Sequence, residues 1–157
     1  MGVQLLEPGT PAPAFSAVNQ NHETVTLDSL KGKKIVLYFY PKAMTPGCTT
    51  QACGIRDSKQ EFADRNAVVL GVSPDAPQRL VKFIDKQDLN FDLLSDEDLS
   101  LCNAFGVWGL KKFMGKEYDG VHRVTYIIDE QGVIQHVMGK VKTKSHHDDV
   151  LAILDEM

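Results

Sequence analysis

The chain has 157 residues, 43% of them apolar and 24% charged, which is typical of one globular domain and unlike a disordered chain. Its formal net charge is −4, so it lacks the basic excess of nucleic-acid-binding proteins, and we expect no nucleic-acid partner. No apolar run approaches the ~18 residues of a membrane span, and residues 1–13 do not have the pattern of a signal peptide. We therefore expect a single domain over residues 1–157 that is cytoplasmic and not associated with a membrane.

The first half of the chain predicts a strand–helix–strand unit. Residues 24–27 alternate in polarity and indicate a short edge strand or one arm of a hairpin. Residues 35–40 and 67–72 are continuous β-branched and aromatic runs, typical of strands buried on both faces in a parallel sheet. Between them, residues 47–64 repeat apolar side chains at helical spacing. We expect one helix there and a right-handed crossover between the two strands.

The middle of the chain predicts two more helices with a short strand between them. The Ser-Pro-Asp segment 73–75 combines an N-cap residue with a proline suited to the first helical position. Residues 91–94 indicate a short strand. Ser95 and Asp98 have the spacing of a capping box for a short helix that ends near Phe105.

The last third of the chain predicts a loop, a β-hairpin and a final helix. Residues 107–120 carry three glycines and several charged side chains, and we expect a long loop there. Residues 123–128 and 133–137 flank a turn and predict an antiparallel hairpin, and an amphipathic helix follows near Ser145. This order predicts an α/β sandwich with a mixed central β-sheet flanked by helices, with its active site at the carboxyl end of the first buried strand.

That end of the strand leads into a candidate nucleophile. Thr45 is suited to cap a helix and Pro46 to begin it, which puts Cys48 in the first turn. Unpaired backbone N–H groups and the positive end of the helix dipole lie there, and both stabilise a thiolate over a thiol. The alternative is that Cys48 is a small apolar residue that fills the helix–sheet interface.

A second cysteine, Cys53, follows five residues later. In an ideal helix the two Cα atoms lie roughly 8–9 Å apart, beyond the ~7 Å that a disulfide tolerates. Cys48 and Cys53 can therefore join only if the helix unwinds. The spacing is unlike a Cys-x-x-Cys redox pair or a zinc ligand set, so we expect no metal. Cys53 could also be a passive core residue.

The pattern Pro41-x-x-x-Thr45-x-x-Cys48, followed by Cys53, resembles the active-site signature of peroxiredoxins. The wider sequence is similar to the bacterioferritin comigratory protein, or peroxiredoxin Q, branch over residues 38–49, 93–98, 105–109, 114–116, 118–120 and 122–123. The resemblance implies a thioredoxin-like fold and a thiol-dependent peroxidase, an oxidoreductase that needs no cofactor. It also implies hydrogen peroxide or organic hydroperoxides as substrates.

The resemblance implies a role for each matching residue. Cys48 would attack the peroxide and become a sulfenic acid, and Cys53 would resolve it as an intramolecular disulfide. Thr45 would hold the thiolate and the peroxide, and Pro41 would cover the site. Arg123 would point its guanidinium at the same place and stabilise the developing charge. A thioredoxin- or glutaredoxin-like dithiol would restore the thiols of a protein that is usually a monomer.

Gln51 departs from the resemblance, because many members of this branch carry Glu three residues after the first cysteine. An amide accepts a hydrogen bond but has no charge to anchor an arginine, which leaves the orientation of Arg123 open. We interpret Cys102 as a core residue of the short helix, and we do not expect the adjacent His146 and His147 to bind a metal.

Two rival functions remain at this point. A disulfide reductase on the same fold would lack peroxide reactivity, and the four residues between the cysteines count against it. A binding module, such as a redox sensor or chaperone, needs no activated thiolate, so the combination of Pro41, Thr45, Cys48 and Arg123 counts against that class.

Overall fold

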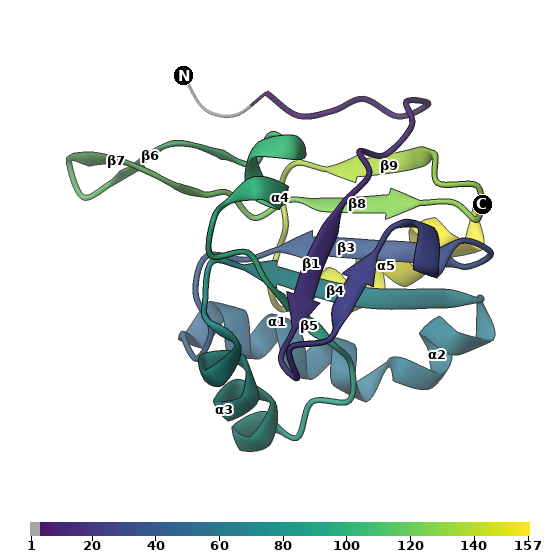
Figure 1. The fold of residues 1–157 in the computed structure, drawn as a ribbon, viewed down its shortest axis with the longest axis horizontal. Coiled ribbons are helices and arrows are strands. Elements are labelled where there is room, and N and C mark those ends of the chain that lie inside the picture. Colours follow the sequence, from purple (N-terminus) through teal and green to yellow (C-terminus); the bar gives the residue numbers. More distant parts are fainter. Residues whose placement is uncertain (1–3) are drawn as a thin grey trace.

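The protein, seen in a computed structural model that describes residues 4–157, is a mixed β-sheet covered by helices (Figure 1). The strands are β1 (Ser16–Asn19), β2 (Thr24–Thr26), β3 (Lys34–Phe39), β4 (Ala67–Ser73), β5 (Leu93–Ser95), β6 (Trp108–Phe113), β7 (Lys116–Val121), β8 (Thr125–Ile128) and β9 (Ile134–Met138). The helices are α1 (Pro46–Asp57), α2 (Lys59–Asp64), α3 (Pro77–Gln87), α4 (Ser100–Ala104) and α5 (His146–Asp155), with a 3₁₀ turn η1 (Asp28–Leu30). None of the described helices has the length and apolarity needed to cross a membrane.

The main sheet has seven strands in the order β2-β1-β5-β4-β3-β8-β9. Strands β3 and β4 are parallel, as predicted, and β8 and β9 form the predicted antiparallel hairpin. Because β8 runs antiparallel to β3, its start meets the carboxyl end of β3, where the Phe39 N–H donates to the Val124 carbonyl at 2.9 Å. The carboxyl ends of β3 and β4 and the start of β8 therefore share one edge.

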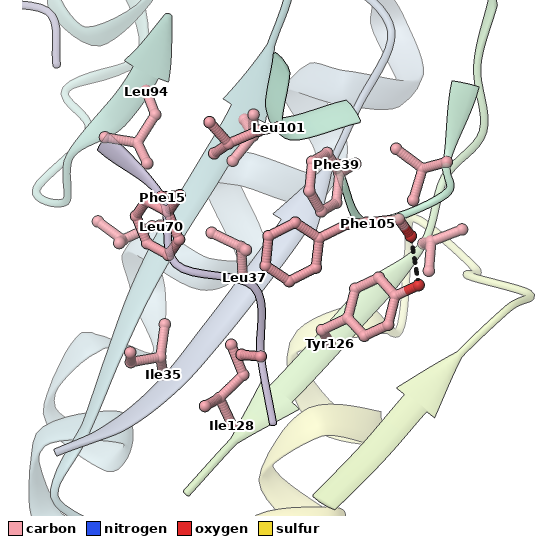
Figure 2. Packing of buried hydrophobic residues seen from close by; sticks show 14 of the residues in the cluster. Phe15, Ile35, Leu37, Phe39, Leu70, Leu94, Leu101, Phe105, Tyr126 and Ile128 are labelled. Carbon is pink, nitrogen blue, oxygen red and sulfur yellow. Dashed lines mark hydrogen bonds between the residues drawn. The ribbon is translucent and has the colours of Figure 1, made fainter. Parts of the chain in front are cut away.

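Strand β3 is buried on both faces, as predicted. Ile35, Leu37 and Phe39 point into a core that includes α4 side chains, shown in Figure 2. Val36 and Tyr38 point the other way, into a core that α1, α2, α3 and α5 cover. All five side chains are at most 1% exposed, and each contributes roughly 1.5–3 kcal/mol by leaving water. The α1 face that carries Cys48 is thereby pressed against the sheet.

The single helix predicted over residues 47–64 is wrong, because the chain divides it at Ser58 into α1 and α2. The Ser58 N–H donates to the Ile55 carbonyl at 3.1 Å, a tighter three-residue turn that ends α1. The Ser58 carbonyl then accepts the Phe62 N–H, and α2 begins there. Helix α1 is consequently a short unit with ends of its own.

The helix predicted to open at residues 73–75 begins instead at Pro77. The Ser73 hydroxyl does not cap a helix but donates to the Asp75 carboxylate at 2.8 Å. That carboxylate also accepts the Ala43 N–H, across the sheet edge, at 2.7 Å. A residue pair that resembles a helix cap thus ties two loops together.

The capping box predicted at Ser95 and Asp98 is also wrong. Ser95 belongs to β5 and is too far from the start of α4 to cap it. Asp96 acts in its place, because its buried carboxylate accepts the N–H groups of Leu101 at 3.0 Å and Cys102 at 2.8 Å. The start of α4 therefore carries a negative charge of its own.

The loop predicted over residues 107–120 is a two-stranded hairpin of β6 and β7 that projects from the main sheet (Figure 1). Its two-residue turn uses Met114 and Gly115, both with positive φ, as hairpin turns require. Lys112 and Glu117 face each other across the strands at 3.7 Å. Glycines and charges weakened the strand pattern, while cross-strand pairing supplies the stability.

Candidate active site

Cys48 is the third residue of α1 and is 2% exposed. Thr45 is the extended N-cap and Pro46 the first helical residue, as predicted. The Thr45 side chain does not cap the helix, because its hydroxyl donates to the Lys42 carbonyl at 2.9 Å. The first-turn N–H groups therefore remain available to stabilise an anion at Cys48.

Arg123 lies against Cys48, although 75 residues separate them. Its Nη2 donates to the Cys48 sulfur at 3.2 Å, and its Nη1 donates to the Gln51 side-chain oxygen at 3.0 Å. Gly47 makes this approach possible, because a Cβ there would lie 3.0 Å from Nη2. The arginine fork therefore joins the cysteine to the second turn of the same helix.

Gln51 fixes the arginine in spite of its missing charge, and it begins a buried polar chain. Its amide nitrogen lies 3.2 Å from Nδ1 of His146, and Nε2 of that ring lies 2.8 Å from the Thr125 hydroxyl. All three side chains are 0% exposed. Burial lowers the pKa of His146 to about 4, so the ring is neutral at physiological pH. Sequence reasoning found Gln51 but not the two residues behind it.

Two further residues hold the loop that precedes α1. The Asp75 carboxylate accepts the N–H of Ala43 at 2.7 Å, and Arg79 donates to the carbonyl of the same residue at 2.8 Å. Asp75 and Arg79 pair with each other at 3.1 Å. Next to this clamp, Met44 has a φ of 66°, which is unfavourable for a residue with a side chain. Sequence reasoning missed the clamp, although loops after adjacent parallel strands meet at one edge.

Pro41 lies just after β3, beside a groove of about 460 Å³ between this loop and the β6–β7 hairpin. Trp108 and Lys111 line the groove from the hairpin. The Lys111 ammonium donates to the Val121 carbonyl at 2.9 Å, and burial and the nearby Arg123 charge lower its pKa. Pro41 thus borders a partly apolar groove that Lys111 lines from the β6–β7 hairpin.

Cys53 lies further along α1 and faces a different neighbour. Its sulfur is 3.6 Å from the side-chain oxygen of Gln87 in α3, and it is only partly buried. All three cysteines are free thiols. Among residues 4–157, no cluster of His, Cys, Asp or Glu side chains is arranged to bind a metal ion.

Comparisons with known proteins identify the family. Residues 8–137 match the AhpC/TSA family. A "Putative peroxiredoxin bcp" of Haemophilus influenzae is 54% identical over 149 residues, 95% of this chain and 96% of the relative. "Peroxiredoxin Bcp" of Bacillus subtilis is 49% identical over 152 residues, 97% of each chain.

Solved structures give the same result. The bacterioferritin comigratory protein of Xanthomonas campestris, studied for alkyl peroxide reduction, superposes with a TM-score of 0.89 at 34% identity, covering 96% of this chain and 98% of the other. A PrxQ variant of Xylella fastidiosa superposes with a TM-score of 0.92 at 30% identity, covering 98% of each chain. The thioredoxin-like peroxiredoxin fold expected from the sequence is therefore confirmed, and the chain belongs to the AhpC/TSA family, in its Bcp or peroxiredoxin Q branch.

Proposed function

We propose that this peroxiredoxin reduces peroxides with Cys48 and resolves the product with Cys53. The observation that carries the proposal is the 3.2 Å contact between Arg123 and the Cys48 sulfur, in an uncapped first turn of α1. A fixed cation and free N–H groups stabilise a thiolate, which is the nucleophilic form of cysteine. A core cysteine with no chemical role would not need a partly buried arginine in contact with its sulfur.

In the first step the Cys48 thiolate attacks the terminal oxygen of a hydroperoxide. A sulfur–oxygen bond forms, the oxygen–oxygen bond breaks, and the released alkoxide or hydroxide takes a proton to leave as alcohol or water. The sulfur is oxidised to a sulfenic acid while the peroxide is reduced. Arg123 would stabilise the charge on the leaving oxygen, and the Thr45 hydroxyl would turn from the Lys42 carbonyl to hold the peroxide.

In the second step the Cys53 thiol attacks the sulfenic sulfur, which gives a disulfide and water. The helix must first unwind, because Cα atoms five residues apart lie too far from each other in α1. The break at Ser58 would confine this unwinding to residues 46–57 and leave α2 intact. Unwinding would break the bond from Arg56 to the Gln87 carbonyl, which ties the end of α1 to α3.

A dithiol reductant of the thioredoxin or glutaredoxin type would close the cycle. Its two thiols become a disulfide as those of Cys48 and Cys53 are restored. Cytoplasm is the compartment in which such reductants keep thiols reduced, and we place the cycle there. Because both cysteines lie in one chain, a monomer suffices for the whole cycle.

A thiol count tests the proposal directly. The reduced protein, with three cysteines, is treated with one equivalent of hydrogen peroxide, and its free thiols and cross-linked peptides are measured. We expect the three thiols to fall to one, with a Cys48–Cys53 linkage. Loss of the Cys48 thiol alone would contradict the role of Cys53, and absence of rapid loss would contradict peroxide reduction.

Cys53→Ser separates the two steps. The variant should still lose the Cys48 thiol to the first equivalent of peroxide, but excess peroxide should then carry Cys48 on to sulfinic acid. Hydrogen exchange provides the structural measurement. In the wild type, oxidation should remove protection from residues 48–55, and in the variant that protection should persist. Normal cycling of Cys53→Ser with a dithiol donor would show that another thiol resolves Cys48.

A further inference from the structure

The hydrogen-bonded chain Arg123–Gln51–His146–Thr125, in which only Arg123 is partly exposed, has only one workable direction of hydrogen bonding. A guanidinium only donates, so the Gln51 group that faces Arg123 must be the amide oxygen. The amide N–H₂ then faces Nδ1 of His146, which must be unprotonated to accept. The proton of the neutral ring is consequently on Nε2, where it donates to the Thr125 hydroxyl.

We propose that His146 is a positioning residue of the active site, which acts through Gln51 to hold Arg123 against Cys48. This role rests on the proposed function of Cys48. An amide side chain has two ends of similar shape, and the Gln51 side chain is 0% exposed, so no water selects between them. Arg123 requires the amide oxygen on its side, and the bare Nδ1 of His146 supports that orientation because it accepts from the amide nitrogen on the other side.

The opposite orientation of Gln51 is strongly disfavoured. It would turn the amide N–H₂ toward the Arg123 guanidinium, so that two donors face each other in the interior. The amide oxygen would then face a ring nitrogen that carries no proton. Arg123 would lose the contact of Nη1 and keep only the single bond to the Cys48 sulfur. A single bond leaves the guanidinium free to turn, whereas two bonds to one helix fix it.

The tautomer of His146 is the first test, and it needs no peroxide. The ring nitrogen chemical shifts of the reduced protein, labelled at histidine, are measured by NMR at neutral pH. We expect His146 to be neutral, with Nε2 protonated and Nδ1 bare. A ring protonated on Nδ1, or an exchanging mixture of tautomers, would overturn the proposal, because such a ring could not accept steadily from the Gln51 amide nitrogen.

The second test uses substitutions and two readouts. His146→Leu removes the acceptor, and we expect the rate of Cys48 oxidation by hydrogen peroxide to fall about tenfold. The thiolate fraction of Cys48, followed by its ultraviolet absorbance and by its alkylation rate, should fall with it. His136→Asn, at an exposed position of β9, is the matched control and should leave both readouts unchanged.

Adding Gln51→Glu to His146→Leu provides the rescue. Both carboxylate oxygens accept, so no orientation is wrong, and we expect most of the tenfold loss to be restored. A loss that Gln51→Glu does not restore would show that His146 acts by packing alone, and an unchanged rate in His146→Leu would also overturn the proposal. If the wild type fails to react with peroxide, the tautomer and the alkylation rate still test His146 independently of the proposed function.

Discussion

Cys48 and Cys102 occupy the same position in two helices and differ in the charge beside them. Each is the third residue of its helix, and each is at most 2% exposed. The Arg123 guanidinium lies beside Cys48, and the Thr45 side chain does not cap the helix. Beside Cys102 lies the Asp96 carboxylate, which already takes two of the first N–H groups of α4.

The difference shows that a helix start does not by itself make a reactive cysteine. Burial and the Asp96 charge raise the pKa of the Cys102 thiol, so that cysteine stays protonated. A sulfur at the start of an uncapped helix, with a cation in contact, has the opposite surroundings. The neighbours from other elements, rather than the helix position, decide which thiol becomes a nucleophile.

The largest effect is expected from removing each cysteine in turn. Cys48→Ser should lower peroxidase turnover by at least about a thousandfold with every peroxide, because the nucleophile is gone. Cys102→Ala should keep turnover within about twofold and lose only the stability of a small buried side chain. Turnover by Cys48→Ser near that of the wild type would contradict the assignment. Retention of an unrelated binding function in that variant would favour the binding-module alternative.

Replacing the cation while keeping its charge sharpens the comparison. Arg123→Lys keeps a positive charge near Cys48, but one ammonium cannot reproduce the two-pronged contact with the cysteine and Gln51. We expect kcat/KM for hydrogen peroxide to fall by roughly 10²–10³, the usual cost of losing one preorganised donor. Arg65→Lys, which alters an exposed pair with Asp155, is the control and should change little. Equal losses of kcat/KM in Arg123→Lys and Arg65→Lys would contradict a special role for the two Arg123 contacts.

These two sites also show how far the sequence alone leads. The continuous runs at 35–40 and 67–72 predict buried strands because their pattern needs no tertiary information. Thr45, Pro46 and Cys48 predict a helix start for the same local reason. Arg123 was identified only through resemblance, because its contact depends on how β8 pairs with β3.

The errors come from contacts that the local sequence pattern does not show. Ser73 and Asp75 look like a helix start, but they bond to each other, and Asp75 also bonds to the loop before α1. Asp96 caps α4 from outside the predicted box. His146 could not be linked to Gln51 from the sequence, because the two residues are 95 positions apart and meet only in the folded structure. Tertiary contacts override local preference at Asp75 and His146, whereas Asp96 acts on residues only five and six positions later.

Acid should lower the free energy of unfolding through His146, the buried residue that contacts Gln51 behind Cys48. Burial lowers the pKa of this histidine to about 4, while an unfolded histidine has a pKa near 6.5. Between these values the unfolded chain binds the extra proton, so the free energy of unfolding falls as the pH falls from about 6.5 to about 4. This difference in pKa corresponds to roughly 3 kcal/mol, which denaturant unfolding at a series of pH values can measure.

Groups from several elements face the His146 ring and act on its protonation together. They are Tyr38, Gln51, Arg123, Thr125, His147 and Asp149. Asp149 favours protonation, whereas His147 and Arg123 oppose it. His146→Asn is the reference, because asparagine does not titrate in this range. The difference between the two pH profiles should show the extra loss in the wild type, and identical profiles would exclude His146 as its source.

The smallest effect is expected on the Cys102 side. Asp96→Asn removes the charged acceptor of the Leu101 and Cys102 N–H groups and should lower the free energy of unfolding by about 2 kcal/mol. It should not make Cys102 reactive, since burial is the larger cause of its raised pKa and persists in the variant.

The measurement is the alkylation rate of Cys102 in the folded protein, with Asp98→Asn at an exposed neighbouring position as the control. If Cys102 in Asp96→Asn became as reactive as Cys48 without loss of stability, charge alone would decide reactivity. The outcome we expect instead requires both a cation in contact and an uncapped helix start, and the chain provides these together at Cys48.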